Sequence, residues 1–118
     1  MPNLSVKEFS RVIAQDDVVV LDVRTPEEFF EGFIEGAQHI DFYRVDFESE
    51  INLLDKNLTY AVYCRSGKRS GKAIEIMQKA AFHKLFSLDG GITDWVDAGM
   101  PLTPVSYTHL TLPTKRIV

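Results

Sequence analysis

The sequence predicts an α/β domain built on a mostly parallel sheet. Residues 18–23 form a continuous apolar, largely β-branched run ending in Asp-Val, and residues 60–64 form a second short apolar run. Such runs are typical of strands buried on both faces of a parallel sheet. Segments with apolar residues at helical spacing separate the two runs from each other and flank them. Alternation of strands with helices indicates the α/β class.

The first helix and the first strand are predicted from local patterns. Ser5 and Glu8 have the spacing of a capping box, and apolar residues at helical spacing continue the helix to about residue 14. The buried strand of residues 18–23 follows after a short polar segment.

A second capping box stands directly after this strand. Thr25 is expected to be the N-cap, with Pro26 in the first helical position and Glu28 reaching back to the cap. Beyond this helix we expect a short strand over residues 36–40 and a short helix over residues 46–54.

The second half repeats the strand and helix pattern. The strand of residues 60–64 leads into a short loop, and a helix begins at about Ser70 with apolar residues along one face. A third short strand over residues 84–88 and a last helix over residues 92–98, before Gly99, complete the prediction.

Composition excludes several classes of protein. The chain has 118 residues, 45% hydrophobic and 25% charged, which are ordinary values for one soluble globular domain. The start lacks a signal-peptide pattern and no stretch is long and apolar enough to span a bilayer, so we expect a cytoplasmic location and no membrane partner. A net charge of -4 argues against a nucleic-acid partner.

Cys64 is the one cysteine of the chain. A single cysteine excludes an internal disulfide, a two-cysteine redox motif and a cysteine-rich zinc site, and we expect neither a metal nor a cofactor. Cys64 ends a predicted strand, and ligands of open α/β sheets bind beyond the carboxyl ends of strands. The cysteine is therefore expected where chemistry takes place.

Cations surround this cysteine. Residues 65–72 carry four of them and no acid, although the chain is acidic overall. A free thiol has a pKa near 8.5 and the thiolate is the nucleophile, so an environment that stabilises the anion is needed. Loop amides, the helix N-terminus and the cations all favour negative charge. We expect Lys72 to lie on the solvated face of the helix. Arg65, Lys68 and Arg69 are expected to bind a sulfonate or thiosulfate group, whose outer sulfur Cys64 attacks.

Each of these residues also has a simpler, purely structural interpretation. A lone cysteine is most often an inert core thiol, and the cations are then solvated. Ser66 is then a turn residue, Ser70 the N-cap of the helix and Gly67 a residue required for its backbone conformation. The combination of strand end, cationic loop and helix start favours a reactive thiol.

Four segments of the chain resemble the single-domain rhodaneses, in the order and spacing of that family. They are LDVRTPEEFFEGFIEGA (residues 21–37), CRSGKRS (64–70), GKAIEIMQKAAF (71–82) and GGITDWVDAGMPL (90–102). The resemblance extends over about residues 4–105, which we expect to be one domain. It implies a three-layer fold with a mostly parallel sheet of about five strands flanked by helices.

The resemblance also implies a ping-pong sulfurtransferase that needs no cofactor. The loop cysteine of such enzymes takes a sulfane sulfur from a donor such as thiosulfate, becomes a persulfide, and passes the sulfur to cyanide, a thiol or a partner sulfur-carrier protein. By position, Cys64 is the nucleophile, and Asp22 and Arg24 frame the loop through ion pairing and hydrogen bonding. The expected substrate-binding residues are Arg65, Ser66, Gly67, Lys68, Arg69 and Ser70.

Two positions depart from the family pattern. Phe33 stands where the family often has His, which would change an edge of the substrate approach. Ala81 stands where the family often has Gly, at a cost of about 1 kcal/mol if the backbone there is left-handed. Trp95 matches the family and is expected to pack in the core.

Two other functions stay open on the sequence. Phosphatases of the same architecture carry a C-x5-R loop, whereas Cys64 to Arg69 is C-x4-R, a shorter loop better suited to a sulfur-sized group. A non-catalytic interaction module typically lacks the cysteine or the loop cations, and this chain has both.

Residues 106–118, SYTHLTLPTKRIV, follow neither a helical nor a strand period. The segment resembles translated sequencing-adapter sequence, and the alternative is an ordinary terminal extension. In neither case is it expected to carry function.

Overall fold

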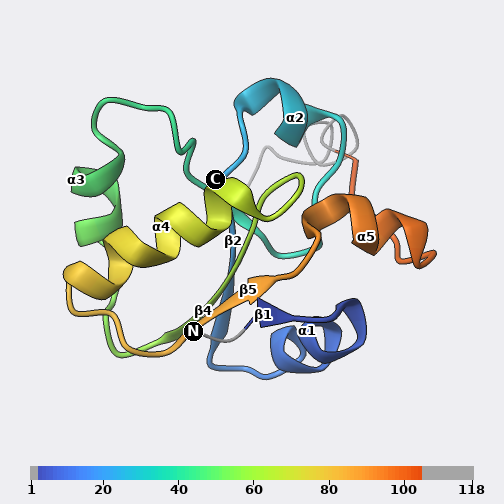
Figure 1. Cartoon of the computed structure of the whole chain (residues 1–118), viewed down its shortest axis with the longest axis horizontal. Helices are drawn as coiled ribbons and strands as arrows, with labels where there is room; N and C mark the ends of the chain where they lie inside the picture. Colours follow the sequence, from blue (N-terminus) through green and yellow to red (C-terminus); the bar gives the residue numbers. More distant parts are fainter. Residues whose placement is uncertain (1–2, 105–118) are drawn as a thin grey trace.

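Five parallel strands form one sheet, in the order β1-β5-β4-β2-β3 (Figure 1). The computed structural model describes residues 3–104, so the tail at 106–118 lies outside the described residues. The predicted α/β class and parallel sheet are confirmed. The strands are β1 (Asn3–Leu4), β2 (Val18–Asp22), β3 (Gln38–His39), β4 (Thr59–Tyr63) and β5 (Leu85–Leu88).

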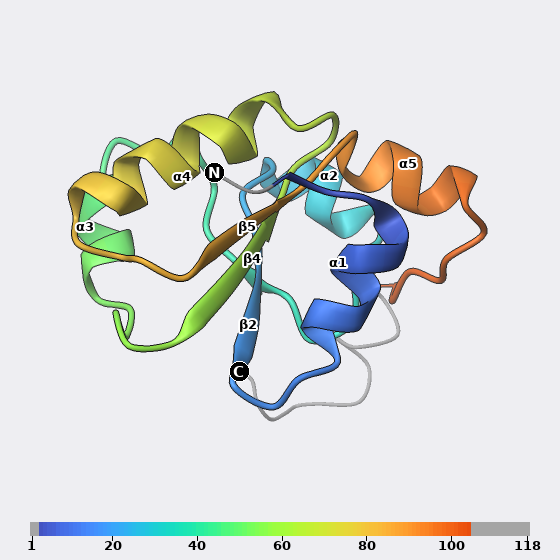
Figure 2. The same ribbon diagram turned by 60° about the horizontal axis from the view of Figure 1, so that its bottom comes forward.

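Helices cover both faces of this sheet. Figure 2 shows α3 and α4 on one side and α1 and α5 on the other. Within residues 3–104, no helix is both long enough and apolar enough to cross a membrane. The helices are α1 (Val6–Ile13), α2 (Pro26–Phe30), α3 (Phe47–Asn52), α4 (Lys68–Lys79) and α5 (Gly91–Asp97).

Both predicted capping boxes are present. The Glu8 amide donates to the Ser5 hydroxyl at 3.2 Å, and the Ser5 amide donates to the Glu8 carboxylate at 3.0 Å. Thr25 and Glu28 make the same reciprocal pair at the start of α2, where Pro26 is the first residue. These local hydrogen bonds satisfy amides that a helix N-terminus leaves without intrahelical partners.

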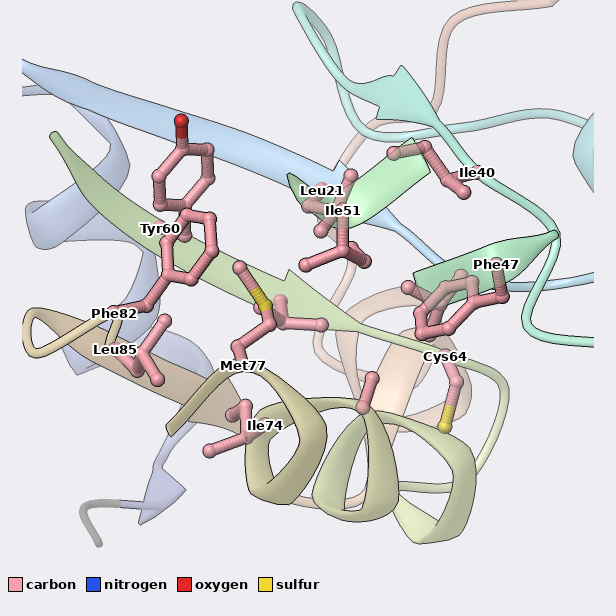
Figure 3. Packing of buried hydrophobic residues seen from close by; sticks show 13 residues of the cluster. Leu21, Ile40, Phe47, Ile51, Tyr60, Cys64, Ile74, Met77, Phe82 and Leu85 are labelled. Carbon is pink, nitrogen blue, oxygen red and sulfur yellow. The ribbon is translucent and has the colours of Figure 1, made fainter. Parts of the chain in front are cut away.

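The core consists of two apolar clusters, one on each face of the sheet. The first lies under α3 and α4, and Figure 3 shows its side chains, including Met77 and Phe47. The second lies under α1 and α5 and includes Phe9 and Trp95, whose rings meet edge to face at 6.2 Å. The prediction that Trp95 packs in the core is confirmed, because its side chain is 3% exposed and its indole N–H donates to the Pro101 carbonyl.

Several elements differ from the prediction. The sequence did not predict β1, whose two residues pair in parallel with β5. Helix α4 begins at Lys68, two residues before the predicted start, and its N-cap is Gly67 with a φ of 102°. The assignment of Ser70 as a possible N-cap is therefore wrong. Ala81, just beyond α4, does have a positive φ, of 73°.

Phe33 lies inside the fold. Its side chain is 8% exposed and stacks on the ring of Phe29, with the ring centres 4.4 Å apart. Its backbone forms an isolated antiparallel bridge with Thr103, in which each amide donates to the other residue's carbonyl. Phe33 therefore contacts α2 through its ring and the segment that follows α5 through its backbone.

Candidate active site

Cys64 directly follows β4, at the carboxyl end of a central strand. Its side chain is 1% exposed and belongs to the apolar cluster beneath α4. Figure 3 shows Cys64 at one end of that cluster, with its sulfur directed toward the first turn of α4. We refer to residues 64–69 as the sulfur loop. The sequence predicted this position, because strand and helix patterns stand directly on either side of the cysteine.

Small uncharged groups contact the sulfur. The Gly67 amide donates to Sγ of Cys64 at 3.0 Å, and the thiol donates to Oγ of Ser70 at 3.6 Å. The left-handed φ of Gly67 turns the chain from the loop into α4, a conformation that side-chain-bearing residues rarely adopt. The N-terminal turn of α4 thus approaches the sulfur, and that end of a helix favours negative charge.

Ser87 is a buried hydroxyl that the sequence analysis missed. It lies in β5, is 2% exposed, and its Oγ is 3.1 Å from Oγ of Ser70. Ser70 donates its one hydroxyl proton to the Gly67 carbonyl at 3.1 Å, so Ser87 is the donor in the pair of hydroxyls. Cys64, Ser70 and Ser87 therefore form one hydrogen-bonded chain inside the fold.

The N-terminus of α5 holds the start of the sulfur loop. The Ile92 amide donates to the Cys64 carbonyl at 2.9 Å, and the Thr93 amide and hydroxyl both donate to the Arg65 carbonyl, at 3.2 and 3.0 Å. A Cβ at Gly91 would lie 2.5 Å from the Arg65 carbonyl oxygen, so only glycine permits this approach. The position of the loop in Figure 1, beside the start of α5, reflects these contacts.

The loop cations have different surroundings. Arg65 and Lys68 are exposed, as is Lys72 in α4, where the sequence predicted a solvated side chain. Arg69 donates to both carboxylate oxygens of Glu28, at 2.7 and 2.9 Å. The guanidinium of Arg69 is thus already paired, although the sequence suggested that it faces an anion.

The pKa of Glu28 reflects this ion pair. The hydrogen bonds from Arg69 lower the pKa of the Glu28 carboxyl to about 2, against the opposing effect of burial, and hydrogen bonds from Thr25 add to the lowering. The same hydrogen bonds raise the pKa of Arg69, and the nearby Cys64 sulfur adds a smaller effect in the same direction. The charges of Arg69 and Glu28 therefore stabilise each other.

Asp22 and Arg24 form a buried ion pair at the end of β2. Nη2 of Arg24 donates to Oδ2 of Asp22 at 2.7 Å and to the Gly32 carbonyl at 2.7 Å. The Tyr63 hydroxyl donates to the same carboxylate at 2.7 Å and accepts from the Ile34 amide. Burial, together with the charge of Asp22, raises the pKa of Tyr63, so this phenol stays protonated.

A cleft of about 280 Å³ opens beside the sulfur loop. Arg65 lines it, whereas Cys64 itself does not. Its remaining walls include Glu28 and Glu31 of α2 and its C-terminal end, residues of the first turns of α5, and the buried Arg24, which precedes α2. Among residues 3–104, no group of three or more His, Cys, Asp and Glu side chains is placed to hold a metal ion.

The structure thus brings Gly67 and Ser70 to the cysteine sulfur, pairs Arg69 with Glu28, and leaves Arg65, Ser66 and Lys68 at the surface. The fold and the site define a class of protein: a parallel α/β domain that presents a thiol in a loop between a strand end and a helix N-terminus.

Comparison with known proteins identifies the family within this class. The rhodanese-like domain model matches residues 5–98, and the chain belongs to that family. A sulfurtransferase of Allochromatium vinosum is 29% identical over 92 residues, which cover 78% of this chain and 84% of that protein. The thiosulfate sulfurtransferase GlpE of Pseudomonas aeruginosa is 34% identical over 89 residues, covering 75% of this chain and 78% of that protein.

A solved structure shares the fold. The crystal structure of a rhodanese-related protein from Thermoplasma volcanium superposes with a TM-score of 0.77 at 26% identity, covering 87% of this chain and 98% of that one. The resemblance drawn from the sequence is confirmed, and the relatives support a sulfurtransferase role in general terms.

Proposed function

We propose that the protein transfers a sulfane sulfur through a persulfide on Cys64, with thiosulfate or a related persulfide as donor. In the first half-reaction the Cys64 thiolate attacks the outer sulfur of thiosulfate. A bond forms between the two sulfurs, the bond to the sulfonate sulfur breaks, and sulfite leaves with the electron pair. The single observation that carries the proposal is the placement of the sulfur against the Gly67 amide and the Ser70 hydroxyl.

The groups around the sulfur suit an anion. Once the thiol proton is lost, the Ser70 hydroxyl turns its own proton from the Gly67 carbonyl to the sulfur, while Ser87 continues to donate to Ser70. The Gly67 amide and the first turn of α4 add dipoles aimed at the same atom. These groups stabilise the thiolate and then the persulfide without moving the backbone.

The second half-reaction unloads the sulfur onto another molecule. Cyanide or a thiolate attacks the outer sulfur of the persulfide, the sulfur–sulfur bond breaks, and the Cys64 thiolate is restored with its electron pair. The products are thiocyanate or a new persulfide. Because the chain has no second cysteine, no disulfide within it can release the sulfur, and the acceptor is a small molecule or a partner sulfur-carrier protein.

The length of the loop supports sulfur transfer over phosphate chemistry. Cys64 to Arg69 is C-x4-R, one residue shorter than the C-x5-R loop of the phosphatases of this architecture, and a shorter loop suits a sulfur-sized group better than a phosphate. The retained thiol likewise supports an enzyme over a non-catalytic module.

The test is a sulfur-transfer assay with a matched variant. Wild-type protein incubated with thiosulfate and cyanide is expected to release thiocyanate, and protein taken before cyanide is added is expected to gain the mass of one sulfur. Cys64→Ser should lose turnover by at least about 1000-fold, because the nucleophile is removed, while its thermal unfolding changes little. Wild-type protein that gains no sulfur and forms no thiocyanate would contradict the proposal, and hydrolysis of an aryl phosphate would restore the phosphatase alternative.

A further inference from the structure

The cleft beside the sulfur loop has charged walls of both signs. Two acids and two arginines line it: Glu28, Glu31, Arg24 and Arg65. A ligand in the cleft meets the net effect of these four side chains, so their own partners decide which charges remain available.

Two of the four charges are satisfied inside the protein. Arg24 pairs with Asp22 and is 3% exposed. Glu28 accepts two hydrogen bonds from Arg69, which neutralise its charge locally. A ligand has no unsatisfied charge to bind at either position.

The other two charges have no internal partner. Within residues 3–104, the side chains of Glu31 and Arg65 make no ion pair or hydrogen bond, and both are exposed. They carry opposite signs and line the same cleft. Arg65 directly follows Cys64, whereas Glu31 stands at the C-terminal end of α2.

The wall of the cleft is also partly apolar. Ile92, Val96 and Leu102 line it, and Val96 is 49% exposed. A cleft that combines apolar side chains with one unpaired anion and one unpaired cation fits a small organic molecule that carries both charges. The volume of about 280 Å³ is just below the range of about 300–1,000 Å³ that is usual for drug-sized ligands, which suits a smaller molecule.

We propose that this cleft binds a zwitterionic thiol, a molecule with a carboxylate and an ammonium group, as the organic partner in sulfur transfer. Arg65 binds the carboxylate and Glu31 binds the ammonium group, which holds the thiol beside the sulfur loop, at the residue that directly follows Cys64. The inference rests on the proposed function, because it names the class of molecule that exchanges sulfur with the Cys64 persulfide. Glu31 is a specificity residue that disfavours thiols with negative charge alone.

Two acceptors with carbon chains of equal length distinguish the effect of the ammonium group from that of the carboxylate. Cysteine and 3-mercaptopropionate both carry a carboxylate and a thiol on the same carbon chain, and only cysteine carries the ammonium group. Sulfite release from thiosulfate is measured at increasing concentrations of each acceptor, with wild-type protein and with Glu31→Gln. The intrinsic reactivity of each thiol is the same whichever protein it meets. The change in KM between wild-type protein and Glu31→Gln therefore reports the contribution of the Glu31 carboxylate.

Glu31→Gln is expected to raise the KM for cysteine about fivefold and to leave the KM for 3-mercaptopropionate unchanged or lower. Glu35→Gln removes an exposed charge outside the cleft lining and is expected to change neither KM. Turnover with cyanide, which has no ammonium group, should be the same in wild-type protein and in Glu35→Gln.

Equal changes in both KM values, or no change in either while cyanide is still turned over, would overturn the inference and leave the proposed function standing. No turnover of wild-type protein with any acceptor, cyanide included, would overturn the proposed function and this inference together.

Discussion

The inner and outer sides of the sulfur loop carry different kinds of polar group. On the inner side the sulfur meets the Gly67 amide and the hydroxyl chain of Ser70 and Ser87, all uncharged, with both serines buried. On the outer side are the exposed Arg65 and Lys68. Arg69 lies between the two and is paired with Glu28.

This difference separates two tasks. A hydroxyl group can either donate or accept a hydrogen bond, depending on how its proton is turned. The inner side can therefore form hydrogen bonds with the sulfur both as a neutral thiol and as an anion. A fixed charge in contact with the sulfur would favour one state only. The outer charges act over a longer distance, on whatever molecule approaches. We infer that the inner side governs reactivity and that the outer side governs the choice of donor and acceptor.

The largest effect is expected on the inner side. Ser70→Ala should lower kcat/KM with thiosulfate about tenfold, because the anion loses one hydrogen bond, and Ser87→Ala should lower it about threefold through Ser70. Both losses should be nearly the same at low salt and at about 1 M salt, since dipoles in contact are not screened. Steady-state rates and the rate of alkylation by iodoacetamide measure the effect.

Ser49→Ala, an exposed change in α3, is the matched control and should behave as wild type. A loss for Ser87→Ala that follows a fall in thermal stability, with the alkylation rate unchanged, would show that this hydroxyl serves packing alone.

A smaller effect is expected on the outer side. Arg65→Ala should raise the KM for thiosulfate about fivefold at low salt, and the difference should shrink as salt is added, because an exposed charge is screened. Arg65→Lys should restore most of the affinity, and Lys72→Ala, an exposed cation farther along α4, should have little effect. A loss that is independent of salt would assign Arg65 to the structure of the loop.

The smallest effect is expected at the ion pair of Glu28 and Arg69, which lies between the inner and outer sides of the sulfur loop. The pKa of Glu28 is lowered from 4.5 to about 2, so its carboxylate contributes stability above about pH 4.5, and this contribution is lost as the pH falls from there toward 2. Glu28→Gln should therefore lower the free energy of unfolding by about 1 kcal/mol at pH 6, a value reduced for partial exposure.

Urea unfolding at pH 6 and near pH 2 measures this contribution. The wild-type protein and Glu28→Gln should differ at the higher pH and have nearly equal stability at the lower. A difference that stays constant over this range would mean that the carboxylate charge does not stabilise the fold.

The sequence predicted the features that depend on neighbouring residues. Both capping boxes lie within four residues, and the position of Cys64 follows from a strand pattern that ends beside it. The predicted start of α4 was wrong because serine is a usual N-cap residue, which favoured Ser70. In the structure Gly67, with its positive φ, ends the loop three residues earlier. Strand β1 has two residues, too few for a periodic pattern.

The features that the sequence did not predict depend on residues brought together by the fold. Ser87 is 17 residues from its partner Ser70, and a single serine in an apolar strand has no local signal of function. Glu28 and Arg69 are 41 residues apart, so the sequence grouped Arg69 with the other loop cations. The alternation in β5 places Ser87 two residues after the buried Leu85, which was the one available sign that its hydroxyl points inward.

The contacts between α5 and the sulfur loop have a consequence for protein synthesis. The carbonyls of Cys64 and Arg65 accept from amides of Ile92 and Thr93, 28 residues further along the chain. A growing chain leaves the ribosome from its N-terminus, so the thiol emerges well before the amides that hold its loop. A nascent chain therefore exposes Cys64 as an ordinary thiol, and the sulfur site is assembled only after α5 has been translated and has folded against the sheet.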